Sequence, residues 1–274
     1  MIDKEETMSA GKKVKIIIAA HKKYRMPSDN VYLPVQVGAF GKESIGYQRD
    51  DEGDNISSLN PYFCELTGLY WAWKNLHDVD YLGLVHYRRY FSLHPHKKDV
   101  FDSVLKESEL EEYLQPKRVI VPRKRRYYIE TLYSHYAHTH FEQHLDETRK
   151  IIEEKYPDYV DSFDLVMKQR WGYMFNMMIM NKDLLNSYCT WIFDILFELR
   201  NRLGEKGLSP FHSRYYGRVS EIIFNVWVQK QLNEGVVSDI YEMPVVYMEK
   251  VNWLNKGIAF LKAKFMGKKY NESF

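Results

Sequence analysis

Three short apolar runs mark the first half of the chain, at residues 14–20, 80–85 and 118–122. A continuous run of this length is typical of a β-strand that is covered on both faces. Between the first two runs, Asn60-Pro61 begins a segment whose apolar residues recur at helical spacing. This alternation of strand, helix and strand predicts an α/β fold, with a mostly parallel central sheet flanked by helices.

The second half of the chain predicts mainly helices. Helical patterns cover residues 130–170, 183–203 and 217–233. Strands are expected at 173–181 and 236–247, a helix at 99–114 and a long functional loop at 26–57, where glycine and proline interrupt any periodicity. We therefore expect a polar N-terminal tail at 1–13, one domain at 14–248 with a helix-rich C-terminal half, and a basic tail at 249–274.

Composition narrows the classes of function only slightly. The formal net charge of +2 over 274 residues gives no general case for nucleic-acid binding, whereas 15% aromatic residues suit either a packed core or a surface for ringed ligands. Two cysteines form no disulfide or zinc pattern, and no signal peptide or long apolar window is present. These features predict a cytoplasmic protein that does not span a membrane.

The residues that follow two of the predicted strands carry the candidate chemistry. Ala20 is followed by His21 and Lys22, and the strand at 80–85 is followed by His86-Tyr87-Arg88-Arg89. Ligands of open parallel sheets bind beyond the carboxyl ends of the strands, and guanidinium groups pair well with phosphate oxygens. This pattern favours a phosphate site, although two arginines at a strand end also suit a surface ion-pair site.

A carboxylate-dense segment lies at the end of the long loop, at residues 49–55. Its oxygens suit a divalent cation or a sugar hydroxyl, and a solvated acidic turn is the plainer interpretation. The bidentate glutamate of an EF-hand is absent, so we reject a structural calcium site.

Histidines and a glutamate provide further candidates in the second half. His135, His138, His140 and His144 lack the spacing of a zinc site, so we expect helix histidines, of which one could serve as an acid or base. Glu221 lies near the start of a predicted helix, where it suits either a general base or a carboxylate that complements the helix dipole.

Residues 250–270 alternate lysine with large apolar side chains. This composition is typical of a helix that lies on an anionic membrane surface, and a C-terminal packing helix is the competing interpretation. The basic run at 123–126 would add to the same membrane contact.

Several motifs together resemble a known family. The segments that carry the resemblance are His21-Lys22, Gly53-Asp-Asn-Ile-Ser57, Cys64-Glu-Leu-Thr67, Tyr70-Trp-Ala-Trp-Lys-Asn75, His86-Tyr-Arg-Arg-Tyr-Phe91 and Gly217-Arg-Val-Ser-Glu221. Over residues 14–248 the chain is similar to bacterial capsular and exopolysaccharide glycosyltransferases that were long described only as a domain of unknown function.

The resemblance implies a glycosyltransferase A-type fold and a UDP-sugar donor. It also implies transfer of a hexosyl group, galactosyl or galactofuranosyl in some relatives, to a lipid-linked saccharide at the cytoplasmic membrane face. The catalytic candidates are His86, Arg88, Arg89, Glu221 and Asp54. The donor-binding candidates are Ala20, His21, Lys22, Asp51, Asn55, Ser57, Asn60, Glu65 and Tyr87.

The predicted strand at 80–85 is followed by His-Tyr-Arg-Arg and not by the Asp-x-Asp pair of metal-dependent members of this fold. We therefore name no metal ligand, and we expect Arg88 and Arg89 to neutralise the diphosphate with little or no need for a divalent ion such as Mn²⁺. The alternative function is a non-catalytic module that binds nucleotide sugars or carbohydrate. A nucleotidyl or phosphoryl transferase ranks last, because the chain has no phosphate-binding P-loop.

Overall fold

A computed structural model describes residues 11–95 and 97–249 of the chain. The central sheet has the strand order β10-β6-β9-β4-β1-β2-β3, and β5 and β11 extend from β4 as an antiparallel pair. All strands on the main path run in the same direction except β9, which is antiparallel to both of its neighbours. The predicted fold class, α/β with a mostly parallel sheet flanked by helices, is confirmed.

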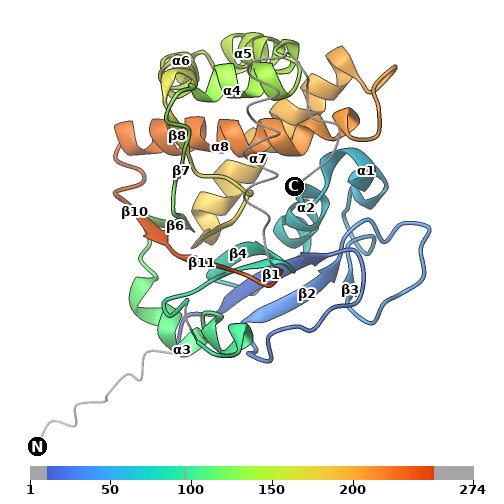
Figure 1. Cartoon of the computed structure of the whole chain (residues 1–274), viewed down its shortest axis with the longest axis vertical. Helices are drawn as coiled ribbons and strands as arrows, with labels where there is room; N and C mark the ends of the chain where they lie inside the picture. Colours follow the sequence, from blue (N-terminus) through green and yellow to red (C-terminus); the bar gives the residue numbers. More distant parts are fainter. Residues whose placement is uncertain (1–10, 96, 250–274) are drawn as a thin grey trace, which may run out of the picture.

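The strands of the sheet span Val14–Ala20 (β1), Tyr32–Gln36 (β2), Gln48–Arg49 (β3), Tyr81–His86 (β4), Arg89–Phe91 (β5), Arg118–Pro122 (β6), Met178–Asn181 (β9), Asp239–Met243 (β10) and Val245–Tyr247 (β11). A separate ribbon pairs Arg125–Arg126 (β7) with Trp171–Gly172 (β8). The α-helices are Asn60–Phe63 (α1), Leu66–Asn75 (α2), Glu107–Leu110 (α3), Leu132–Thr139 (α4), Gln143–Lys155 (α5), Val160–Lys168 (α6), Lys182–Leu203 (α7) and Tyr215–Asn233 (α8). Helices α4 to α8 lie on one side of the sheet, and α3 lies on the other (Figure 1).

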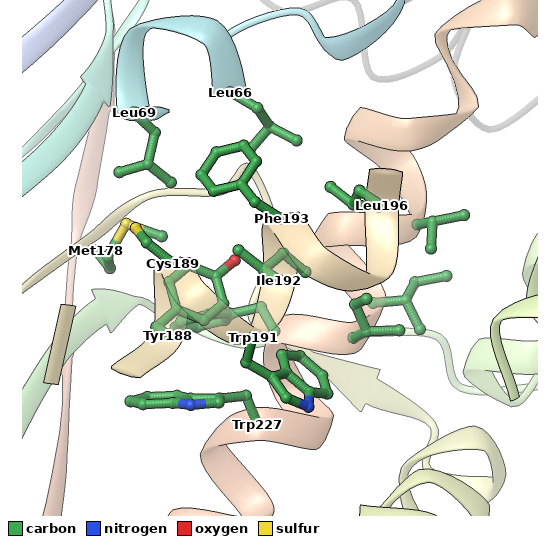
Figure 2. Packing of buried hydrophobic residues seen from close by; sticks show 14 of the residues in the cluster. Leu66, Leu69, Met178, Tyr188, Cys189, Trp191, Ile192, Phe193, Leu196 and Trp227 are labelled. Atoms are coloured by element: carbon green, nitrogen blue, oxygen red, sulfur yellow. The ribbon is translucent and has the colours of Figure 1, made fainter. Parts of the chain in front are cut away.

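The sheet buries side chains on both faces, as its apolar strands predict. Along β1, Ile17 and Ala19 belong to the larger core beneath the helices, whereas Ile16 and Ile18 belong to a second core on the opposite face. Figure 2 shows the larger core, with side chains of α7 packed between Leu66 and Leu69 of α2 and Trp227 of α8. Helix α7 begins where the Asn181 side chain accepts a hydrogen bond from the Leu184 N–H, and it ends at Gly204 with φ of 61°.

The predicted loop at 26–57 is wrong in part, since it contains β2 and β3. Pro34 argues against a strand at β2, because proline has no N–H to donate to a neighbouring strand. The short strand β3 pairs only with Val35 and Gln36, so no bond to β3 is lost at Pro34.

The predicted helix at 99–114 is also wrong, because Val104 and Lys106 are extended. The Leu105 carbonyl accepts from the Tyr32 hydroxyl and its N–H donates to the Phe91 carbonyl, at 2.7 and 2.9 Å. These tertiary hydrogen bonds divide the segment into short turns and the brief helix α3.

Three other predicted elements are shorter than expected because the backbone turns inside them. The helix that begins at Asn60 is interrupted at Cys64, where φ is 54°. The expected strand at 173–181 starts only at Met178, because Phe175 and Asn176 also have positive φ, and Pro244 separates β10 from β11. The strands at 14–20, 80–85 and 118–122, the helices between 130 and 170, and α7 and α8 follow the prediction closely.

Candidate active site

A pocket of about 910 Å³ opens at the carboxyl ends of β1, β2 and β4. Helix α1, the start of α2, the turn after β4 and the N-terminal part of α8 form its walls. The lining residues are Ala19, His21, Val37, Lys42, Asn60, Pro61, Cys64, Glu65, His86, Tyr87, Arg88, Arg89, Phe175, Pro210, Phe211, Arg214, Gly217, Arg218 and Glu221. The pocket lies where the fold predicts a ligand, and its surface is strongly basic.

Four guanidinium groups line this pocket. Arg88 and Arg89 follow β4, as predicted, whereas Arg214 and Arg218 come from the residues around the start of α8. Within residues 11–95 and 97–249, only Arg88 of these four forms an ion pair, with Glu249 at 3.1 Å. Such a concentration of cations with so few anionic partners favours a polyanionic ligand.

Arg89 is the most constrained of the four. Its guanidinium carbon lies 4.4 Å from the centroid of the Phe175 ring, so the aromatic face holds the side chain. Its Nε is buried and has no hydrogen-bond partner among the described residues. A buried donor without a partner is costly, and an anionic ligand in the pocket would satisfy it.

Arg214 and Arg218 are positioned by contacts with neutral groups. The Nε of Arg214 donates to the Cys64 sulfur at 3.0 Å, and Arg218 donates to the Phe211 carbonyl at 2.8 Å. Burial lowers the pKa of Arg218 from its usual value, and it raises the pKa of the Cys64 thiol to about 11. Cys64 is therefore a neutral thiol that leaves the charge of Arg214 available to a ligand.

Two carboxyl groups share the pocket with the arginines. Burial raises the pKa of Glu221 to about 7, and the neighbouring Glu65 carboxylate raises it further, while Arg89 has the opposite effect. A carboxyl group with a pKa near neutrality can accept and release a proton at physiological pH. Glu221 is thus the acid–base candidate among the pocket carboxyl groups.

His86 and Phe175 close the floor of the pocket. The Nε2 of His86 donates to the Phe175 carbonyl oxygen at 2.5 Å, and burial lowers the pKa of the imidazole. The neutral ring with a proton on Nε2 therefore anchors Phe175, whose positive φ turns its ring beneath Arg89. The structure gives His86 a supporting contact, and its predicted catalytic role stays a prediction.

At the rim, Tyr87 stacks on Tyr24 with ring centroids 4.0 Å apart, and His21 approaches Tyr87 edge-on at 5.2 Å. Lys22 lies over the Tyr24 ring at 5.2 Å and does not line the pocket. His21 and Tyr87 therefore line the site, whereas Lys22 contacts Tyr24 outside it.

The structure separates the predicted residues into two groups. His21, Asn60, Glu65, His86, Tyr87, Arg88, Arg89 and Glu221 line one pocket, whereas Ala20, Lys22, Asp51, Asp54, Asn55 and Ser57 do not. In the acidic loop, Asp51 forms a bidentate pair with Arg49, and the Asn55 side-chain amide donates to the Asp51 and Gly53 carbonyls. Asp54 accepts from the Tyr70 hydroxyl at 3.3 Å. These side chains stabilise their own loop.

Asp50 belongs to the acidic segment at 49–55 but is not among the predicted site residues, and it organises the wall beside β2. It is fully buried and accepts hydrogen bonds from the Gly38 and Ala39 N–H groups at 2.8 and 3.0 Å, and from the hydroxyls of Ser57 and Thr67. Gly38 has φ of 65°, and a Cβ there would overlap the Asn60 side chain. Asp50 therefore sets the backbone that brings Asn60 to the pocket.

None of the histidines between 135 and 144 lines the pocket. The Nδ1 atoms of His135 and His138 contact the buried Glu130 carboxylate at 2.9 and 2.6 Å, and His144 contacts the Tyr136 hydroxyl. Within the described residues, no group of three or more His, Cys, Asp or Glu is arranged to hold a metal ion. Metal independence itself stays a prediction.

A family model described as a domain of unknown function, DUF4422, matches residues 15–232. The chain belongs to this family. The solved structures include a similar chain, described as the apo structure of the WbbM bifunctional glycosyltransferase, with 27% sequence identity and a TM-score of 0.79. The match covers 87% of this DUF4422 chain and 46% of the WbbM chain, so this chain spans less than half the length of that structure. No curated protein matches.

Six residues that shape the pocket of this DUF4422 chain are not among the predicted site residues: Lys42, Cys64, Phe175, Phe211, Arg214 and Arg218. Arg214 and Phe211 precede a helix that was predicted to begin at 217, so they seemed to belong to a connecting segment. Cys64 and Phe175 lie at backbone turns with positive φ, which these residue types do not signal. The C-terminal segment 250–274, predicted to contact a membrane, lies outside the described residues.

Proposed function

We propose that this chain is a glycosyltransferase that moves a hexosyl group, galactosyl or galactofuranosyl, from a UDP-sugar to a lipid-linked saccharide. One observation carries the proposal: Arg89, with a buried and unpartnered Nε, lies in the same pocket as three other arginines and Glu221. A diphosphate is the ligand that best matches such a cluster at the carboxyl ends of parallel strands.

The arrangement suits displacement of UDP from the sugar. Negative charge develops on the β-phosphate as the glycosidic bond breaks, and guanidinium groups already in place stabilise that charge without reorganisation. Glu221, at the same pocket, accepts the proton of the attacking acceptor hydroxyl, and its pKa of about 7 suits this role at physiological pH. Each step uses residues of the chain itself.

The comparisons support the reaction class and no finer detail. The similar structure is described as a glycosyltransferase, and the pocket-bearing region of this chain lies within residues 15–232, which match the family model. The sugar, the lipid-linked acceptor, a role in capsule or exopolysaccharide synthesis and a location at the cytoplasmic membrane face follow from the resemblance seen in the sequence. Within the described residues, no helix is long and apolar enough to cross a bilayer.

A panel of nucleotide sugars tests the proposal in two steps. Thermal stabilisation identifies the donor, and release of UDP with and without saccharide acceptors then measures turnover. We expect Arg89→Ala to lower kcat by about a hundredfold or more, with Arg89→Lys retaining part of the rate, while the melting temperature changes little. Stabilisation by a UDP-sugar with no UDP release over long incubation would favour the alternative, a non-catalytic binding module.

A further inference from the structure

A basic and apolar edge lies on the ribbon formed by β7 and β8 and on the residues that flank it. Tyr128 and Ile129 follow β7 and have 79% and 54% of their surfaces exposed, although both are large apolar side chains. Arg125, Arg126 and Arg170 are exposed on the same ribbon. We call these five residues the ribbon edge; Figure 1 shows the ribbon between helices α4 to α6 and the sheet.

Hydrogen bonds hold the residues of the ribbon edge together. The Tyr127 N–H donates to the Arg170 carbonyl at 2.7 Å, and the Arg170 guanidinium donates to the Tyr128 carbonyl at 3.1 Å. Arg126 pairs with Trp171 across the ribbon. A charged side chain is therefore fixed to the backbone of the exposed tyrosine, and the edge is a built surface with both apolar and cationic parts.

Within the part of the chain that the structure describes, the charges of this edge have no acidic partner. Among residues 11–95 and 97–249, Arg125, Arg126 and Arg170 form no ion pair, although the chain as a whole contains 37 acidic residues. The nearest buried carboxylate, Glu130, is engaged by His135 and His138. An exposed cluster that lacks acidic neighbours is complementary to an anionic surface.

The position of the edge relates it to the pocket. Arg125 lies close enough to Glu221 to lower the pKa of that carboxyl group, and its guanidinium lies 5.1 Å from the Tyr127 ring centroid. Arg125 therefore acts on the charge of Glu221, although no residue of the ribbon edge lines the pocket.

We propose that the ribbon edge is a docking surface for an anionic lipid bilayer. Exposed tyrosine and isoleucine enter the interface between headgroups and acyl chains, while the arginines contact lipid phosphates. The net charge of +2 gives no general case for nucleic acid as the ligand. A bilayer surface offers apolar contacts to Tyr128 and Ile129 and phosphate groups to the arginines.

Vesicle co-sedimentation of the full chain tests this proposal without any need for sugar transfer, so its failure and that of the proposed function are distinguishable. We expect binding to phosphatidylglycerol-containing vesicles, little binding to pure phosphatidylcholine, and release by high salt. Arg126→Ser/Arg170→Ser should weaken binding roughly thirtyfold, since each basic residue contributes about a factor of five. Tyr128→Ser/Ile129→Ser should weaken it at least tenfold.

The matched control replaces exposed residues elsewhere, Phe40→Ser/Lys206→Ser, and should bind as the wild type does. Melting temperatures show that each variant is folded. The proposal is overturned if wild-type protein ignores anionic vesicles, or if both ribbon-edge variants bind like the control. Retained binding in both variants would assign membrane contact to another part of the chain, such as residues 250–274.

Discussion

The side-chain amide of Asn176 donates to Oε1 of Glu65 at 2.7 Å, from inside the wall of the pocket. The same amide donates to the Gly217 carbonyl at 3.0 Å, and its oxygen accepts from the Ser220 hydroxyl at 2.8 Å. Asn176 is only 2% exposed, and both polar atoms of its side chain have hydrogen-bond partners, as a buried amide requires. One residue thus ties the start of α2 to α8 and fixes a carboxylate near Glu221.

This network predicts a large effect of a change at Asn176. Glycine tolerates the φ of 51° at this position, so Asn176→Gly removes the hydrogen bonds without adding backbone strain. We expect a loss of about 2–4 kcal/mol in the free energy of unfolding, because partners on two helices lose their donor or acceptor. Ser220→Ala, which removes one of these bonds, should cost about 1 kcal/mol. Urea denaturation measures both, and equal costs would contradict a central role for Asn176.

Glu221 predicts a pH-dependent stability difference. Its pKa is about 7 in the folded chain and near 4.5 when unfolded, so the folded state binds the proton more tightly and the carboxyl group lowers stability as the pH rises between these values. Glu221→Gln should therefore be more stable than wild type at pH 8, by an amount on the order of 1 kcal/mol, and similar to wild type at pH 5. Chemical denaturation at both pH values checks this, and the variant should transfer no sugar. An unchanged stability difference from pH 5 to pH 8 would show that burial does not shift this group.

The ion pair between Arg88 and Glu249 predicts a modest competition with the donor. Both side chains are about half exposed, so the pair contributes little to stability. Glu249→Gln frees Arg88 for phosphate, and we expect UDP to bind about two- to fivefold more tightly by calorimetry at low salt. Asp78→Asn removes the exposed partner of Lys13 and should leave UDP affinity unchanged. Weaker UDP binding by Glu249→Gln would show that Glu249 supports the site.

The arginine cluster predicts activity without a divalent cation. After treatment with excess EDTA and gel filtration, the rate of UDP release should stay within about twofold of the untreated rate, since guanidinium groups supply the positive charge. Added Mn²⁺ should change the rate little. A complete loss after EDTA that Mn²⁺ restores would place a metal in the reaction.

The sequence predicts those parts of the fold that depend on local pattern. Ile16 to Ala20 form an uninterrupted apolar strand, and α7 has both an Asn cap and a terminal glycine. In both elements the local sequence favours the same structure as the tertiary fold. The basic turn after β4 was visible for the same reason, since its residues follow a clear strand. Of the predicted site, eight residues line the pocket.

The remainder depends on tertiary contacts that leave no local trace. Leu105 forms hydrogen bonds with Tyr32 and Phe91, which are distant in sequence. The loop around Asp50 is built by hydrogen bonds that converge on one buried carboxylate. The acidic residues beside Asp50 resembled a ligand site by composition alone. Their partners, Arg49 and Tyr70, lie within the same part of the fold.

The antiparallel strand β9 has a consequence for how the chain folds. It lies between β4 and β6, so residues 178–181 fill a gap in a sheet whose other strands come largely from earlier in the chain. A ribosome that has released only the first 170 residues has therefore left one edge of β4 unpaired and β6 without a neighbour, because β10, the other partner of β6, is made later still. The sheet that joins β4 to β6 must therefore wait for β9, which is made after helices α1 to α6.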